Sequence, residues 1–214
     1  MYYKTVIWDF NGTLLSDMDI SIKAMNTVLS RRSLPKINSL LEFQSVFGFP
    51  VEDYYKKLGL DFSKESFKVP ADEWVELYTK DMFSSPLTDN AEDALIALKE
   101  AGIRQIVLSA SEKQRLTDHL KSLGILSYFD EVYGTGDVYA KGKADIAKML
   151  SEKGELFPAV LIGDTDHDKI CADIIGCDAY LYSGGFMSEE RLKRLNAPVE
   201  SDLLKIAKEI IKKQ

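Results

Sequence analysis

Acidic and hydroxyl-bearing side chains follow several apolar runs in this sequence of 214 residues. Residues 9–14 read DFNGTL, residues 109–111 read SAS, and residues 163–168 read GDTDHD, with the lysine pair of residues 141–143 (KGK) before the last of these. Carboxylates can attack as nucleophiles or hold a hard cation, and an ammonium group balances anions. These residue types fit chemistry on an anionic substrate if the fold brings them together.

Short β-branched runs alternate with helical patterns over most of the chain. The strand candidates are residues 5–10, 104–109, 131–133, 159–162 and 179–182. The helices expected between and after them are 90–101 (capped by Asp89-Asn90 and ended by Gly102), 111–123 (capped by Ser111), 143–151, 168–175, 188–195 and 202–213. This alternation predicts an α/β fold, a Rossmann-like parallel sheet core with helices on both faces. Because ligands bind at the carboxyl ends of such strands, the candidate residues should share one edge.

The stretch from about residue 17 to residue 85 differs from the rest of the chain. It shows helical runs at 20–31, 40–47, 51–58 and 72–83 and no convincing strand. We therefore expect an inserted all-helical cap domain, residues 16–86, over a catalytic core of residues 1–15 and 87–214. The segments 15–17 and 84–86 are the expected two-strand hinge.

Composition and charge exclude several classes of function. A net charge of -7 argues against a general nucleic-acid binder, which needs a basic face. No apolar stretch reaches the roughly 18 residues of a membrane span, and the first residues do not resemble a signal peptide. Cys171 and Cys177 are expected to be buried thiols in a reducing cytoplasm. The sequence thus favours a cytoplasmic monomer with no nucleic-acid or membrane partner.

The ordered motifs resemble those of the haloacid dehalogenase superfamily, and within it the phosphoglycolate-phosphatase-like members with a helical cap. DFNGTLLSD at residues 9–17 corresponds to the family form DxDGTLxDS, and GDTDHD at 163–168 corresponds to GDxxxD. Ser109 and a motif lysine complete the set, and the resemblance covers essentially the whole chain. It implies a phosphatase that acts on a small phosphorylated metabolite through an aspartyl-phosphate intermediate.

The resemblance also implies a role for each matching residue. Asp9 is the expected nucleophile. Asp164 and Asp168 would hold Mg²⁺ together with Asp9 and the backbone carbonyl of Asn11. The ion would screen the repulsion between the carboxylate and the phosphate.

The phosphate-binding residues follow from the same correspondence. Ser109 and the backbone N–H of Ala110 would donate hydrogen bonds to the phosphoryl oxygens. Lys143 is favoured over Lys141 as the motif lysine because it begins the helix predicted over 143–151.

The predicted cap domain offers one candidate for substrate contact. Phe49 lies in a Gly-Phe-Pro turn near Phe47, Tyr54 and Tyr55. These rings could contact the substrate, although such a cluster is more often the core of a small helical domain. His167 is expected to be a surface residue at a helix start.

Asn11 departs from the family pattern, which has aspartate two residues after the nucleophile. That aspartate protonates the leaving group and later helps to deprotonate the attacking water, and asparagine can do neither. General acid–base catalysis is worth roughly 10²–10⁴ in rate. We expect slow hydrolysis of alkyl phosphates and a smaller loss for aryl or acyl phosphates, which leave without a proton.

Four alternatives compete with the phosphatase. A phosphosugar mutase would need the aspartate that Asn11 replaces, and a dehalogenase would not need Asp164 and Asp168. A signalling receiver domain has no room for the large helical insertion. A non-catalytic or regulatory phosphate-binding protein on the same fold is supported by Asn11, but the retained Asp9, Ser109, Lys143 and Asp164 argue against it.

Overall fold

The computed structural model describes residues 2–136 and 142–213 of the chain. The strands are β1 (Thr5–Trp8), β2 (Arg104–Glu112), β3 (Glu131–Thr135), β4 (Ala159–Gly163), β5 (Asp178–Tyr182) and β6 (Val199–Glu200). The helices packed with them are α5 (Ala91–Glu100), α6 (Lys113–Ser122), α7 (Lys143–Ser151), α8 (Asp166–Ile175), α9 (Glu189–Leu192) and α10 (Leu203–Lys212), with short 3-10 turns at Leu126–Tyr128 and Gly154–Leu156.

The described strands form one six-stranded sheet in the order β3-β2-β1-β4-β5-β6, and every pair is parallel. In β1, Ile7 lies opposite Ile106 of β2 and Leu161 of β4. The carboxyl ends of these three strands therefore meet at one edge of the sheet. The predicted α/β fold with a parallel sheet is confirmed. The strand β6 was not predicted, because two residues cannot show an alternation.

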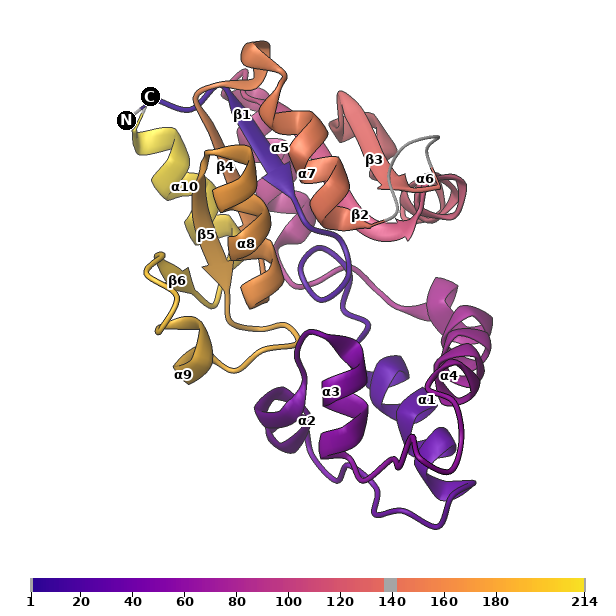
Figure 1. The fold of residues 1–214 in the computed structure, drawn as a ribbon. Helices are drawn as coiled ribbons and strands as arrows, with labels where there is room; N and C mark the ends of the chain where they lie inside the picture. Colours follow the sequence, from indigo (N-terminus) through magenta and orange to yellow (C-terminus); the bar gives the residue numbers. More distant parts are fainter. Residues whose placement is uncertain (1, 137–141, 214) are drawn as a thin grey trace.

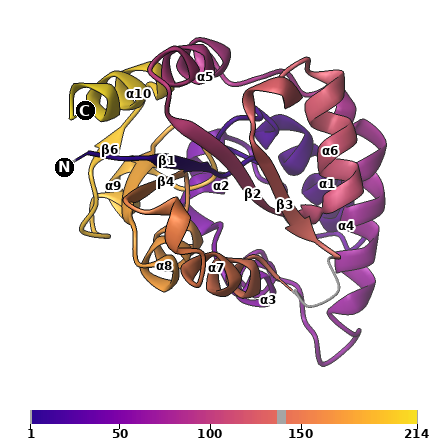
Figure 2. The ribbon, with the colours of Figure 1, turned by 90° about the horizontal axis from the view of Figure 1, so that it is seen from above.

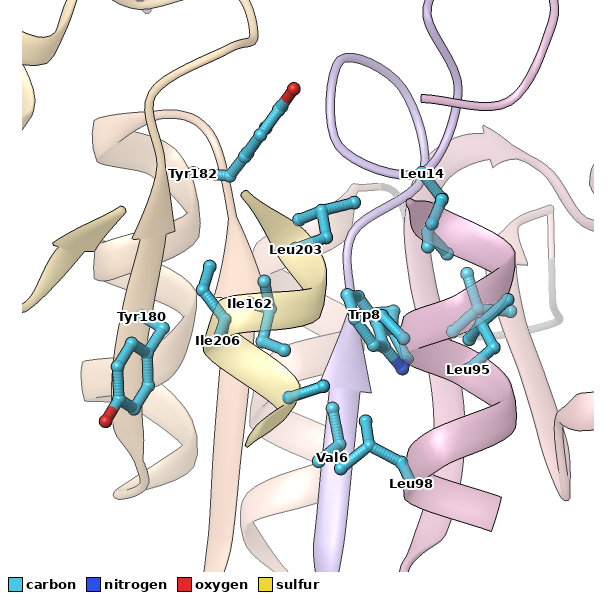
Figure 3. Close-up of a cluster of buried hydrophobic side chains, with 14 of the residues drawn as sticks. Val6, Trp8, Leu14, Leu95, Leu98, Ile162, Tyr180, Tyr182, Leu203 and Ile206 are labelled. Carbon is cyan, nitrogen blue, oxygen red and sulfur yellow. The ribbon is translucent and has the colours of Figure 1, made fainter. Parts of the chain in front are cut away.

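Helices cover both faces of the sheet, and the side chains of β1 alternate between the two cores. Val6 and Trp8 point to the face covered by α5 and α10, where they join Leu98 and Ile206 (Figure 3). Ile7 points to the opposite face, which α7 and α8 cover (Figure 2). All five side chains are fully buried. This packing holds β1 rigidly at the centre of the fold.

The chain leaves the sheet after β1 and forms the helical insertion, residues 16–86. Its helices are α1 (Met18–Ser30), α2 (Leu40–Val46), α3 (Val51–Lys57), α4 (Lys68–Asp81) and the 3-10 turn η1 (Met82–Ser84). Figure 1 shows the insertion beyond the carboxyl ends of the strands. Its helices pack around an apolar core with Met25, Phe43 and Tyr54 among the buried members, and Phe186 from the segment after β5 joins this core. Its two connecting segments lie side by side, since Ser16 N–H donates to the carbonyl of Pro86 at 2.9 Å.

Two side chains also link the insertion to the segment that follows β5. Gln44 of α2 donates to the backbone carbonyl of Gly185 at 2.7 Å. Arg191 of α9 donates to the carbonyl of Gln44 at 2.8 Å and to that of Phe47. These bonds hold α2 against the sheet edge.

Some helix boundaries differ from the prediction. The expected cap by Ser111 is wrong, because β2 continues through Glu112, whose carboxylate accepts from the N–H groups of Gln114 and Arg115, each at 2.9 Å. Asn90 precedes α5 in a left-handed conformation without a side-chain cap. The helix predicted over 188–195 is confined to α9. These differences do not move the candidate residues from the sheet edge.

Two further expectations concern membranes and cysteines. Within residues 2–136 and 142–213, every helix is too short or too polar to span a membrane.

Cys171 is buried and Cys177 half-buried, and both are free thiols. Burial raises the pKa of each thiol to about 12, so both stay protonated at neutral pH.

Candidate active site

The loop after β1 places Asp9 at the edge of the sheet. Asp9 N–H donates to the carbonyl of Ile162 in β4 at 2.8 Å, so the pairing between strands continues to this residue. Gly12 then turns the chain with φ of 76°, in the left-handed region that favours glycine. A Cβ atom at Gly12 would lie 2.1 Å from the ring of Phe186 and 2.5 Å from the carboxylate of Asp164. Glycine is therefore required for the loop to pack against the second acidic segment.

Three buried aspartates meet where β1 and β4 end. Carboxylate oxygens of Asp9, Asp164 and Asp168 lie within 4.8 Å of one another. The hydroxyl of Thr13 donates to Asp164 Oδ1 at 2.8 Å, and Phe186 N–H donates to Asp164 Oδ2 at 2.6 Å. The backbone thus fixes the orientation of Asp164, and the three carboxylates converge on one point.

Lys143 begins α7 and reaches into this cluster. Its ammonium group contacts the carboxylates of Asp9 and Asp168, and the side chain is buried. The other oxygen of Asp168 accepts from the hydroxyl of Thr165 at 2.6 Å and from Thr165 N–H at 2.9 Å. The N–H of Asp168 donates in turn to the hydroxyl oxygen of Thr165 at 3.4 Å, and these two backbone N–H bonds form a capping box at the start of α8. The start of α8 and Lys143 therefore hold Asp168 from two sides. Lys141 lies outside the described residues.

One ammonium group facing three carboxylates leaves an excess of negative charge. Burial, together with the charge of Asp168, raises the pKa of Asp9 to about 6. Burial and the charge of Asp9 raise the pKa of Asp164 well above its usual value. Burial opposes ionisation of Asp168 as well, but Lys143 outweighs it and lowers the pKa of that carboxyl. Three convergent carboxylates with unbalanced charge fit Mg²⁺, which prefers oxygen ligands.

Asn11 is hydrogen-bonded at both ends of its amide. Its Oδ1 atom accepts from the hydroxyl of Ser111 at 3.0 Å and from that of Ser109 at 3.4 Å. Its Nδ2 atom donates to the hydroxyl of Tyr78 at 2.7 Å and to the carboxylate of Asp17 at 2.9 Å. The structure therefore brings Asn11 and Ser109 together, and it fixes at this position a group that cannot exchange a proton with a substrate.

Asp17 and Tyr78 were not among the predicted site residues. Asp17 is 1% exposed, and its carboxylate accepts from Gly12 N–H at 2.8 Å and from the hydroxyl of Tyr78 at 2.5 Å. Burial raises the pKa of Asp17. The signal for this residue is in the first motif, where Ser16-Asp17 reverses the final Asp-Ser of the family form. Tyr78 lies on α4, far along the sequence, and no local pattern marks it.

A cavity of about 540 Å³ lies between the sheet edge and the helical insertion. Asp9, Lys143 and the exposed Ala110 line it from the core. Phe49 lines it from the insertion, and its ring centroid lies 4.8 Å from that of His167. His167 lies in the first turn of α8, as expected, and its side chain is half-buried beside the cavity.

Comparison with known proteins agrees with this arrangement. The family model described as haloacid dehalogenase-like hydrolase matches residues 6–181. A phosphoglycolate phosphatase of Caulobacter vibrioides is 25% identical over 205 residues, which cover 90% of this chain and 84% of that protein.

Two solved structures share the fold. A haloacid dehalogenase-like family protein from Streptococcus pneumoniae superposes with a TM-score of 0.81 at 21% identity, covering 97% of this chain and 98% of that one. A predicted phosphatase from Clostridium acetobutylicum gives a TM-score of 0.81 at 22% identity, and the superposition covers 99% of this chain and 100% of that one. At such identities these two structures establish the fold alone. The family match over most of the sequence shows that the chain belongs to the haloacid dehalogenase-like hydrolases.

Proposed function

We propose that this hydrolase is a Mg²⁺-dependent phosphatase, which hydrolyses a small phosphorylated metabolite through an aspartyl-phosphate on Asp9. The observation that carries the proposal is the cluster of Asp9, Asp164 and Asp168 around Lys143, at the sheet edge where ligands of parallel α/β folds bind. The similarity to a phosphoglycolate phosphatase supports the same reaction class.

The side chains around Asp9 suit nucleophilic attack on phosphorus. One oxygen of Asp9 contacts Lys143, and the other lies 3.3 Å from the hydroxyl oxygen of Thr13, which donates to Asp164. The carboxylate would attack phosphorus, the bond from phosphorus to the leaving oxygen would break, and an acyl phosphate would form on Asp9. Ser109 and the N–H of Ala110 would donate to the phosphoryl oxygens. Water would then attack the same phosphorus, which releases phosphate and restores the carboxylate.

Asp9, Asp164, Asp168 and the backbone carbonyl of Asn11 would hold the magnesium ion. The ion supplies positive charge that lets an anionic carboxylate approach an anionic phosphate. The protein's part is to keep the ligands converged in a buried position, which the hydrogen bonds to Asp164 and Asp168 support.

Asn11 limits the proton chemistry in this proposal. Its amide can orient the two serine hydroxyls but cannot protonate a departing alkoxide. The same residue favours the second candidate function, a non-catalytic or regulatory protein that binds a phosphorylated ligand.

The proposal extends to the organisation of the protein. We propose that residues 16–86 are a cap domain that lies over a catalytic core of residues 1–15 and 87–214. The cap domain would select the substrate. A cytoplasmic location and a monomeric state belong to the same proposal, and size-exclusion chromatography with light scattering tests the latter.

The test is Mg²⁺-dependent phosphate release from aryl, acyl, sugar and two-carbon carboxylate phosphates, with Asp9→Asn as the comparison variant. Turnover that disappears with chelator and in Asp9→Asn supports the phosphatase. Binding of phosphate analogues by the folded protein without turnover of any ester would instead support the regulatory protein.

A further inference from the structure

The wall of the cavity that the helical insertion provides is built from aromatic side chains. Trp74 and Tyr78 of α4 stack on each other with centroids 4.8 Å apart and planes 12° apart. Phe47, Phe49 and Tyr54 line the same cavity. Phe49 is 43% exposed, and Trp74 and Tyr78 are half-buried, so these rings are not fully used by the core of the insertion. They leave aromatic surface available to a ligand.

This wall carries no positive charge. Among the described residues that line the cavity, the insertion contributes no lysine, arginine or histidine. Its acidic member, Asp17, is bonded to Asn11 and Tyr78.

On the core side, the ammonium of Lys143 is already paired with two carboxylates, and Arg115 lines the cavity but is exposed to solvent. His167 also lines the cavity, and burial lowers its pKa, which keeps the imidazole neutral at pH 7. A second anionic group on the substrate would therefore enter the aromatic half without a buried cation, which is costly.

Tyr54 presents its ring to the cavity, while its hydroxyl lies buried behind the wall. It is 4% exposed, and its hydroxyl is a buried atom without a hydrogen-bond partner among the residues the structure describes. A buried hydroxyl without a partner is destabilising, because it has lost its hydrogen bonds to water. Burial also raises the pKa of Tyr54, which keeps the hydroxyl protonated and able to donate. Because this oxygen is inaccessible, a ligand in the cavity would contact the ring of Tyr54 and not its hydroxyl.

The core side of the cavity favours a leaving group that needs no proton. Asn11 cannot supply one. A phenolic oxygen, with a pKa near 10, leaves as an anion far more readily than an alkoxide does. The neutral aromatic wall and the missing acid are independent features, and both suit the same kind of ester.

We propose that the substrates are phosphate monoesters of an uncharged phenol or heteroaromatic hydroxyl compound, with the ring held by Trp74, Tyr78 and Phe49. This inference rests on the proposed phosphatase function. Asp9 attacks the phosphorus, the bond between phosphorus and the aryl oxygen breaks, and the aryl oxide leaves as an anion that takes up a proton from the solvent only after it has left. Water then cleaves the acyl phosphate on Asp9.

The kinetic test separates recognition of the ring from the quality of the leaving group. It compares phenyl, benzyl and butyl phosphates with phosphoglycolate and acetyl phosphate at saturating Mg²⁺. Benzyl and butyl phosphates both release an alkoxide, so we expect a KM about tenfold lower for benzyl phosphate, as for one aromatic stacking contact. Phenyl and benzyl phosphates both carry a ring but differ in the basicity of the leaving oxygen. We expect a higher kcat for phenyl phosphate, and this difference measures the effect of the leaving group.

Variants of the wall locate the effect. Phe49→Leu and Trp74→Leu should each raise the KM for phenyl phosphate. The fold-increase should be about ten times that of the KM for acetyl phosphate, which has no ring. Leu41→Ala is the matched control, because Leu41 lies in α2, is 70% exposed and is absent from the cavity lining. Its KM values should stay at those of the unaltered protein.

A binding measurement keeps the inference testable if the protein turns out not to be a phosphatase. Calorimetry with Mg²⁺ would compare phenylphosphonate, ethylphosphonate and phosphonoacetate, none of which can be hydrolysed. We expect phenylphosphonate to bind at least about tenfold more tightly than the other two. Equal affinities, or tighter binding of phosphonoacetate, would overturn the inference even if phosphate release is observed. Tight binding of phenylphosphonate without turnover of any ester would leave the aromatic site standing and reject the phosphatase.

Discussion

The two sides of the cavity differ in almost every physical respect. The core side carries Asp9, Asp164, Asp168 and Lys143, all buried and fixed by the strand ends and helix starts. The side formed by the helical insertion is aromatic, and it carries no cation among the described lining residues. The difference fits the proposed division of roles, in which the core would supply the reaction and the insertion would select the substrate.

The largest effect should come from the charge balance on the core side. Lys143→Met leaves three converged carboxylates without an ammonium group, so kcat should fall about 10²–10³-fold, as for loss of one preorganised electrostatic contact. The control is Lys148→Met, because Lys148 lies on the same helix and is exposed. Phosphate release at saturating substrate measures both. Equal rates for the two variants would contradict the assigned role of Lys143.

The second prediction concerns the position that departs from the family. Asn11→Asp alone would place a carboxylate beside Asp17, where the amide now donates at 2.9 Å, and the two charges would oppose each other. The double change Asn11→Asp with Asp17→Ser restores both family residues. We expect it to raise kcat for benzyl phosphate about 10²-fold and the single change to raise it less. No gain in either variant would show that Asn11 does not limit turnover.

The third prediction is a pH dependence of stability in the absence of metal. The pKa of Asp9 is about 6 in the folded protein against an ordinary 3.8, and that of Asp164 is also raised. Between about pH 4 and pH 6 the folded state binds more protons than the unfolded state, so stability should fall as pH rises, by about 1–3 kcal/mol. Asp168, whose pKa is lowered, loses its contribution below this window.

Thermal unfolding in chelator at several pH values checks this dependence. Asp9→Asn lacks one of the two carboxyl groups with a raised pKa, and its melting temperature should vary less across the window. Added Mg²⁺ should stabilise the unaltered protein more at pH above 6 than below 5, because it binds ionised carboxylates. Stability that rises with pH in chelator across this window would contradict the charge assignment.

The smallest effect should come from the links between the two sides. Arg191→Met removes the bonds to the carbonyls of Gln44 and Phe47 and should loosen α2 against the sheet edge. We expect KM to rise by about threefold with kcat nearly unchanged, since the core cluster is untouched. Lys193→Met is the control, because Lys193 lies two residues further along the chain and is exposed. A fall in kcat with constant KM would mean that the insertion takes part in the reaction itself.

The positions of the site residues on the core side could be predicted from the sequence better than those on the insertion. Strand alternation and the parallel sheet imply that Asp9, Ser109 and Asp164 end at one edge, and the structure brings them there. Their chemical roles stay predictions. The cap by Ser111 was wrong because β2 runs three residues longer than its apolar part, through Ala110 to Glu112.

The insertion could not be predicted at the same level. Its helices were recognised from their periodicity, but the arrangement of their side chains depends on how four short helices pack. Tyr78 bonds to Asn11 across 67 residues of sequence, and no local pattern encodes such a contact. The sequence likewise does not show whether an aromatic ring is buried in the core of the insertion or lines the cavity. That distinction requires the exposure of Phe49 and Trp74 in the three-dimensional structure.

The most direct test of the central claim is the mass of the Asp9 peptide after acid quenching during turnover of phenyl phosphate with Mg²⁺. The account predicts a phosphoryl group on the peptide that contains Asp9 in the unaltered protein, and none in Asp9→Asn. Steady phosphate release with no phosphorylated Asp9 peptide at any quench time, and with Asp9→Asn as active as the unaltered protein, would contradict it.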